Sequence, residues 1–117
     1  MEFPVRRVEK PWGYELIFAQ TDRYVGKVLH IAPGQALSLQ YHERKDETFF
    51  VANGEIELVV EEDGRTVRRP LREGESYHVV PPTRHRMTAG PAGCELFEVS
   101  TPEIEDVVRL EDRYGRI

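Results

Sequence analysis

GQALSLQYHERKDETFFVANG, residues 34–54, is the stretch that decides the fold of this chain. From Leu37 to His42 the side chains alternate between apolar and polar, which is typical of a β-strand with one buried face. Gln40 and His42 therefore leave the same face of this strand. Downstream, strand-like runs at 48–51 and 55–60 flank Asn53-Gly54, and this dipeptide predicts a tight hairpin because both residues tolerate positive φ. The segment thus predicts consecutive β-strands.

Turn signals recur along the rest of the chain. They divide it into pieces of about ten residues, the spacing of an all-β sandwich or barrel, and they are Pro33-Gly34, Asn53-Gly54, Asp63-Gly64, Glu73-Gly74 and 91–93. Strand-like pieces lie between them at 14–18, 24–31, 66–67, 77–80, 87–89 and 96–99. Residues 102–114 are the best candidate for a helix, although Val107-Val108 fit a closing strand equally well. We expect one all-β domain over residues 1–117.

The composition argues against several classes of partner. The formal net charge is −5, whereas nucleic-acid binding needs a concentrated positive field. Charges in the first ten residues interrupt the apolar run of a signal peptide, and no stretch approaches membrane-spanning length. Cys94 is the only cysteine, which fits a reducing compartment, and we expect it to be a small buried apolar residue. The sequence therefore predicts a cytoplasmic protein with no nucleic-acid or membrane partner.

Four side chains form a candidate metal site. Gln40 and His42 share one strand face, and Glu47 begins the next strand, where it can fold back beside them. His85 follows much later, just before another strand. Two imidazoles, one carboxylate and one amide oxygen suit a transition metal better than calcium or magnesium. We predict one divalent metal ion on these residues, zinc as the first choice, with manganese, iron, cobalt or nickel as alternatives. His30 and His78 lie outside the pattern and are expected at the surface or in supporting positions.

The spacing of these residues resembles the two sequence signatures of the cupin superfamily. The first signature is matched by Gly34, Gln40, His42, Glu47 and Gly54, with Gln40 where a histidine is usual. The second is matched by Gly74, Pro81 and His85, in a form one residue shorter than usual. The resemblance implies a single-domain cupin, which is a jelly-roll barrel also called a double-stranded β-helix.

A longer resemblance covers nearly the whole chain. KPWGYE at 10–15, the stretches 27–34 and 37–40, His85-Arg86 and DVVRLEDRYGR at 106–116 resemble the cupin domain of type II mannose-6-phosphate isomerases. In that family the domain usually follows a guanylyltransferase for mannose 1-phosphate, which this chain lacks, so no nucleotide-sugar synthesis is implied. Lys45 stands where the family commonly has arginine, and Thr48 and Phe49 stand where it commonly has histidine and tryptophan. The resemblance implies interconversion of mannose 6-phosphate and fructose 6-phosphate.

That reaction needs a metal, a proton carrier and cations for the phosphate. One proton moves between C1 and C2 through an enediolate, and a divalent metal polarises the carbonyl. Lys27 alternates with apolar residues, so it is the expected proton carrier if its face points inward and a solvated charge if that face points outward. The predicted catalytic residues are Lys27, Glu47 and Arg86. The predicted substrate-binding residues are Lys45, Arg84, Arg86 and Arg116. Trp12 is expected to fill one end of the barrel, with substrate stacking as the alternative.

Two other classes of function fit the same residues. A metal-binding cupin of different chemistry, such as a dioxygenase or an epimerase-like enzyme, is one, although Gln40 in place of histidine weakens the oxygenase. A non-catalytic carbohydrate-binding or regulatory module is the other. The expected partners are a small-molecule sugar phosphate and a second copy of the chain, because an open-edged sheet needs cover.

Overall fold

The computed structural model describes all 117 residues and contains nine β-strands and no helix, which confirms the all-β prediction. The strands are β1 (Arg6–Lys10), β2 (Gly13–Gln20), β3 (Val25–Ile31), β4 (Leu39–Tyr41), β5 (Glu47–Glu62), β6 (Arg65–Arg72), β7 (Ser76–Val79), β8 (His85–Ser100) and β9 (Val108–Glu111). No segment forms a helix of the length and apolar character needed to cross a membrane.

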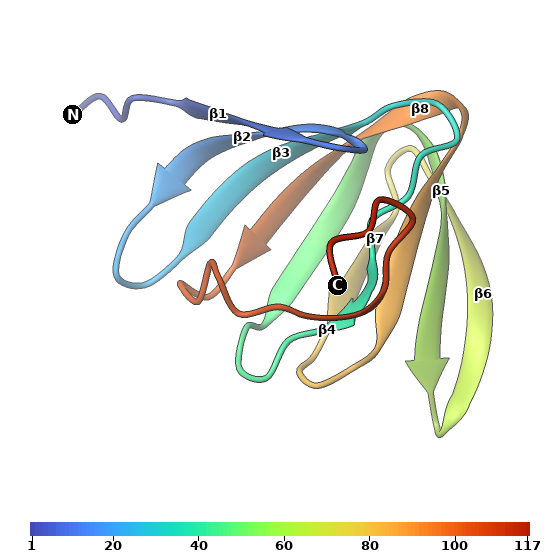
Figure 1. Ribbon diagram of the computed structural model, residues 1–117. Coiled ribbons are helices and arrows are strands. Elements are labelled where there is room, and N and C mark those ends of the chain that lie inside the picture. Colours follow the sequence, from blue (N-terminus) through green and yellow to red (C-terminus); the bar gives the residue numbers. More distant parts are fainter.

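The two longest strands, β5 and β8, belong to both halves of a curled antiparallel sheet. The first part of β5 pairs with β7 and the end of β8, whereas its second part pairs with β6 and the start of β8. One half therefore runs β1-β2-β3-β8-β5-β7, and the other runs β6-β5-β8-β4-β9. The halves splay apart in Figure 1, and the C-terminal segment, drawn in red, crosses the opening between them.

The hairpin predicted at Asn53-Gly54 is wrong, because β5 continues through these residues and bends there. Gly54 has a φ of 78°, and the register between β5 and β8 shifts on both sides of it. A Cβ atom at this position would collide with the carbonyl oxygen of Gly93, the glycine that bends β8 at a φ of 77°. The two glycines thus bend the paired strands together from one half-sheet to the other. The separate strands predicted at 87–89 and 96–99 are accordingly the two parts of β8.

The helix predicted at 102–114 is also wrong, and the alternative of a closing strand is confirmed by β9. The Asp106 carboxylate accepts hydrogen bonds from the backbone N–H groups of Glu43, Arg44 and Lys45 at 3.1, 2.7 and 2.9 Å. Strand β9 then pairs with β4. The Asp106 carboxylate and the backbone of β9 thus bond to distant parts of the chain, so a helix has no advantage there.

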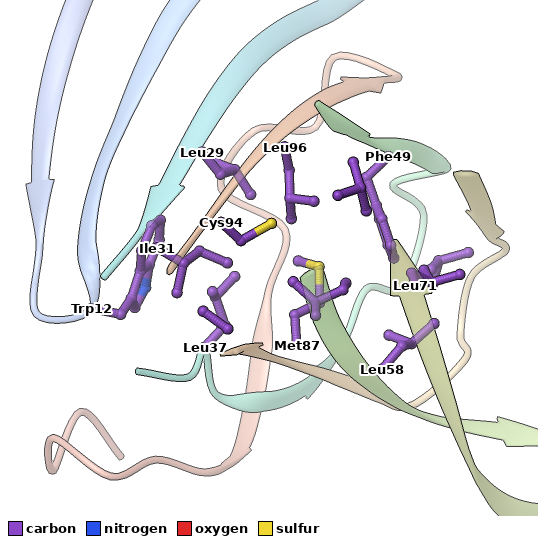
Figure 2. Packing of buried hydrophobic residues seen from close by; sticks show 14 of the residues in the cluster. Trp12, Leu29, Ile31, Leu37, Phe49, Leu58, Leu71, Met87, Cys94 and Leu96 are labelled. Carbon is purple, nitrogen blue, oxygen red and sulfur yellow. The ribbon is translucent and has the colours of Figure 1, made fainter. Parts of the chain in front are cut away.

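Apolar side chains from both half-sheets meet in one core. Figure 2 shows residues such as Leu29, Phe49 and Met87 directed into the space between the strands. Trp12 is 3% exposed and joins this core, as expected. Cys94 is also part of it, and burial raises the pKa of its thiol to about 12, which confirms the apolar role predicted for it. Further along the barrel the inner face becomes charged, and the buried ionisable side chains there are Glu15, Lys27, His42, Lys45, Glu47, His85 and Glu98.

The outer face of the half-sheet that contains β2 and β3 carries exposed apolar side chains. Phe18, Phe50, Phe97 and Val99 are between 41% and 55% exposed, and the rings of Phe50 and Phe97 stack with centroids 6.2 Å apart. The homodimer stays a prediction, and this cluster of exposed apolar side chains is where we would look for its interface. A light-scattering mass near twice 13.6 kDa would support it, and a monomer at micromolar concentration would reject it.

Candidate metal centre

Three buried side chains converge at one end of the barrel. His42 lies just after β4, Glu47 begins β5 and His85 begins β8, and none of them is more than 2% exposed. The Glu47 Oε1 atom lies 3.2 Å from His42 Nε2 and 3.1 Å from His85 Nε2. One ligand atom from each residue falls within 4.8 Å of the others. The structure therefore brings together three of the four predicted ligands in the geometry of a small metal site.

The hydrogen bonds of the two imidazoles identify which nitrogen faces the centre. His42 Nδ1 donates to the carbonyl oxygen of Asp106 at 2.6 Å, and His85 Nδ1 donates to that of Thr83 at 2.9 Å. A carbonyl oxygen only accepts, so each Nδ1 carries a proton, and in the neutral imidazole each Nε2 presents a lone pair toward the centre. Metal-binding histidines are commonly oriented by such a bond from the second nitrogen.

These lone pairs create a site that needs a cation. Two imidazole Nε2 atoms and one carboxylate oxygen face each other, and all three residues are buried. Three electron-pair donors at such distances repel unless a positive charge lies between them. A nitrogen and oxygen donor set of this kind fits zinc and related divalent metals. The residues present therefore fit the predicted metal ion.

The electrostatics of the centre point the same way. Burial alone would lower the pKa of His42, but the hydrogen bond and charge of Glu47 outweigh it and raise the pKa above 6.5. Burial alone would raise the pKa of Glu47, but the imidazoles of His42 and His85 and the charge of Lys45 hold it well below its usual range. The centre thus keeps a carboxylate and attracts positive charge, which a proton or a metal supplies.

Gln40, the fourth predicted ligand, lies beside the centre. It pairs with His85 across β4 and β8, and its side chain lines the adjoining cavity. Its Oε1 atom accepts a hydrogen bond from the Ser38 hydroxyl at 2.7 Å. An amide oxygen has two lone pairs, so this bond leaves one free and fixes the direction of the amide. Coordination by Gln40 stays a prediction.

A polar cavity adjoins the centre and holds two of the predicted basic residues deep in its wall. Lys27 is 6% exposed on the inner face of β3, and its Nζ atom lies 3.4 Å from the Glu15 carboxylate. Lys45 is 5% exposed, and its Nζ atom lies 3.1 Å from Glu47 Oε2 and 3.4 Å from Glu98 Oε2. The inward alternative for Lys27 is thus the observed one. Lys45 contacts the Oε2 atom of Glu47, and the Oε1 atom of Glu47 faces the two imidazoles.

The three predicted arginines fall in different places. Arg116 lines the cavity and is paired with Asp112 at 2.8 Å. Arg84 is exposed and does not line the cavity. Arg86 also lies outside it, because residues alternate along β8 and His85 takes the inward position. Its Nε atom donates to the carbonyl oxygen of Leu37 at 3.0 Å, so it ties strands together. We therefore leave Arg84 and Arg86 out of the proposed substrate site.

Four residues of the site were missed by sequence reasoning: Glu15, Glu98, Asp106 and Arg109, all of which line the cavity. Burial first, and then the nearby charge of Glu47, raise the pKa of Glu98. Each glutamate lies two residues from a core residue on its strand and so shares the inner face with it, as Glu15 does with Ile17 and Glu98 with Leu96. That alternation is a signal that could have placed them inside. His30 and His78 lie on the outer faces of β3 and β7, paired with Glu95 and Asp46.

Comparison with known proteins gives the chain a family. Residues 4–112 match the family described as mannose-6-phosphate isomerase C-terminal. The chain belongs to this family. As a member, it is 36% identical to mannose-1-phosphate guanylyltransferase of Escherichia coli (strain K12) over 117 residues, which are 96% of this chain and 23% of that protein. It is 32% identical to the xanthan biosynthesis protein XanB of Xanthomonas campestris pv. campestris, covering 95% of this chain and 24% of that protein. The chain spans about a quarter of the length of these curated relatives.

Solved structures confirm the cupin fold of this family member. KdgF from Halomonas sp. has a TM-score of 0.73 at 20% identity, and the match covers 88% of this chain and 91% of that one. The capsular polysaccharide assembling protein CapF of Staphylococcus aureus has a TM-score of 0.78 at 17% identity, covering 95% of this chain and 35% of that one. Oxalate decarboxylase of Bacillus subtilis has a TM-score of 0.79 at 17% identity, and the match covers 91% of this chain and 30% of that one. At these identities the likeness concerns the fold alone.

Proposed function

We propose that this chain is a metal-dependent sugar-phosphate isomerase that interconverts mannose 6-phosphate and fructose 6-phosphate. The observation that carries the proposal is the convergence of His42, Glu47 and His85 beside a cavity into which Lys27 also points. The cavity thus combines a cation site with a proton-carrying group, which are the two requirements of aldose–ketose isomerisation. The family to which the chain belongs supports the choice of mannose 6-phosphate.

The metal would be held by His42, Glu47 and His85, with Gln40 as the fourth ligand and zinc as the first choice. Bound there, it would supply a Lewis acid that polarises the sugar carbonyl and stabilises negative charge on its oxygen. Lys45 positions this centre, because its contact with Glu47 Oε2 fixes the orientation of the carboxylate. Removing such a supporting group commonly weakens metal binding by about 10- to 100-fold.

Lys27 would carry the proton between C1 and C2. Its ammonium group is held by Glu15 on the same inner face, since β2 and β3 are neighbours. Glu98 lies opposite Lys27 in the pairing of β3 with β8 and also lines the cavity. Trp12, Leu29 and Leu37 form an apolar part of the wall, which would exclude water from the sugar during the proton transfer.

The proposal is tested by a screen of the purified protein, supplied with several divalent metals, against hexose and pentose phosphates. We expect conversion of fructose 6-phosphate to mannose 6-phosphate, and we expect a chelator to abolish it. Turnover in heavy water should place deuterium at C2 of mannose 6-phosphate when the carried proton exchanges with solvent. Conversion that persists after complete metal removal would contradict the proposal.

The screen also separates the isomerase from a non-catalytic module. The second candidate is a binding or regulatory role, because the chain matches only about a quarter of the length of its curated relatives. That role predicts a metal-loaded protein that binds sugar phosphates and converts none of them.

A further inference from the structure

Arg109 is an arginine of the cavity that has no anionic partner. It lies on β9 directly opposite Gln40 of β4, so both side chains leave the same face, and both line the cavity. Its Nε atom is buried and has no hydrogen-bond partner. A buried N–H group of a guanidinium that remains unpaired is costly, and native structures seldom leave one without a reason.

The other cations of the cavity are already paired. Lys27 lies 3.4 Å from the Glu15 carboxylate, and Lys45 lies between Glu47 and Glu98. Arg116 makes two contacts with Asp112 through its Nε and terminal nitrogen atoms, at 3.0 and 2.8 Å. Lys10, which is partly exposed, approaches Glu15 at 3.9 Å. A new anion would therefore meet competition from a carboxylate at each of these cations, but not at Arg109.

We propose that Arg109 is the phosphate-binding residue of the cavity. A guanidinium presents several N–H donors in a planar fork that matches the oxygens of a phosphate group, and hydrogen bonds between opposite charges are the strong ones. The proposal rests on the proposed function for the choice of a sugar phosphate as the natural ligand. It moves the phosphate role from Arg84 and Arg86, which lie outside the cavity, to a residue whose buried Nε atom lacks a partner.

Inorganic phosphate is the direct probe, because it needs no turnover. Titration of the purified chain, followed by calorimetry and by the nitrogen-15 signals of the arginine Nε–H groups, is expected to show binding and a shift of the Arg109 signal. Arg109→Met should weaken phosphate binding by about 10- to 100-fold, the range expected for a lost hydrogen bond to a charged group. Arg65→Met, which changes an exposed arginine of β6 outside the cavity, should bind phosphate as the unaltered chain does.

Arg109→Lys keeps the charge and removes the fork, so we expect an intermediate loss of phosphate affinity and a preserved fold. If Arg109→Met does not fold, the Arg109→Lys titration and the signal shift in the unaltered chain decide the question. Equal phosphate affinity in the unaltered chain and in Arg109→Met would overturn the proposal, since the phosphate would then bind a metal or another cation. Suppose that Arg109→Met loses phosphate binding while the unaltered chain isomerises no sugar phosphate. This result would support the phosphate site and count only against the isomerase.

Discussion

Protein carrying His85→Ala is expected to bind its metal more than about 100-fold more weakly and to have no measurable isomerase activity. Replacing a supporting group around a metal already costs about 10- to 100-fold in affinity, and His85 is a predicted ligand. The loss leaves Glu47 with one imidazole, and the open centre cannot hold the cation in the same geometry. Elemental analysis after gel filtration, together with conversion of fructose 6-phosphate, measures both effects. His42→Ala is expected to behave in the same way.

The matched control is His30→Ala. His30 is half-exposed on the outer face of β3, where it stacks on Tyr14 with ring centroids 4.8 Å apart. Its removal should leave the metal content unchanged. Metal retained in both His42→Ala and His85→Ala would show that the ion binds elsewhere.

Lys27→Met is expected to lower kcat by about 10²- to 10⁴-fold while leaving the metal bound, because a positioned proton carrier contributes that much. Lys27 points into the cavity but is absent from the group of three metal ligands, so its loss should spare the centre. Steady-state kinetics with mannose 6-phosphate and the metal content of the same sample are the measurements. A kcat within a factor of about three of the unaltered chain would remove Lys27 from the mechanism.

Stability has to be separated from catalysis in this variant. Methionine at position 27 leaves the buried Glu15 carboxylate with only Lys10 nearby at 3.9 Å, and breaking a buried ion pair costs about 3–5 kcal/mol. The double variant Glu15→Gln/Lys27→Met removes both charges and should recover much of the stability but none of the activity. Recovery of activity in the double variant would mean that the single variant failed through unfolding.

The candidate metal site could be predicted from sequence because strand alternation and the spacing of the two signatures point to the same residues. Gln40 and His42 share a strand face by alternation, and the spacing of the two cupin signatures predicted Glu47 and His85 as further ligands. The structure brings His42, Glu47 and His85 together, with Gln40 beside them. The inward direction of Lys27 was one of two predicted alternatives, since alternation alone does not say which face of a strand is buried.

Other features depended on contacts that sequence patterns do not encode. Of Asn53-Gly54, only Gly54 adopts a positive φ, and its packing against Gly93 bends a continuous strand instead of closing a hairpin. The outward direction of Arg86 is different, because the strand alternation that turns His85 inward also turns Arg86 outward and could have been read from the sequence. Asp106 fixes the loop after β4 from a distant part of the chain, so a helix pattern at 102–114 gave way to long-range hydrogen bonds.

The most direct test of the central claim is the metal content of the unaltered protein. Purified without chelator, or dialysed against zinc, manganese or iron and then freed of excess ion, the chain is predicted to hold about one equivalent of a divalent transition metal. His42, Glu47 and His85 present their lone pairs to one point, and these atoms lie within 4.8 Å of one another. Elemental analysis that finds no bound metal under any of these conditions would contradict the account.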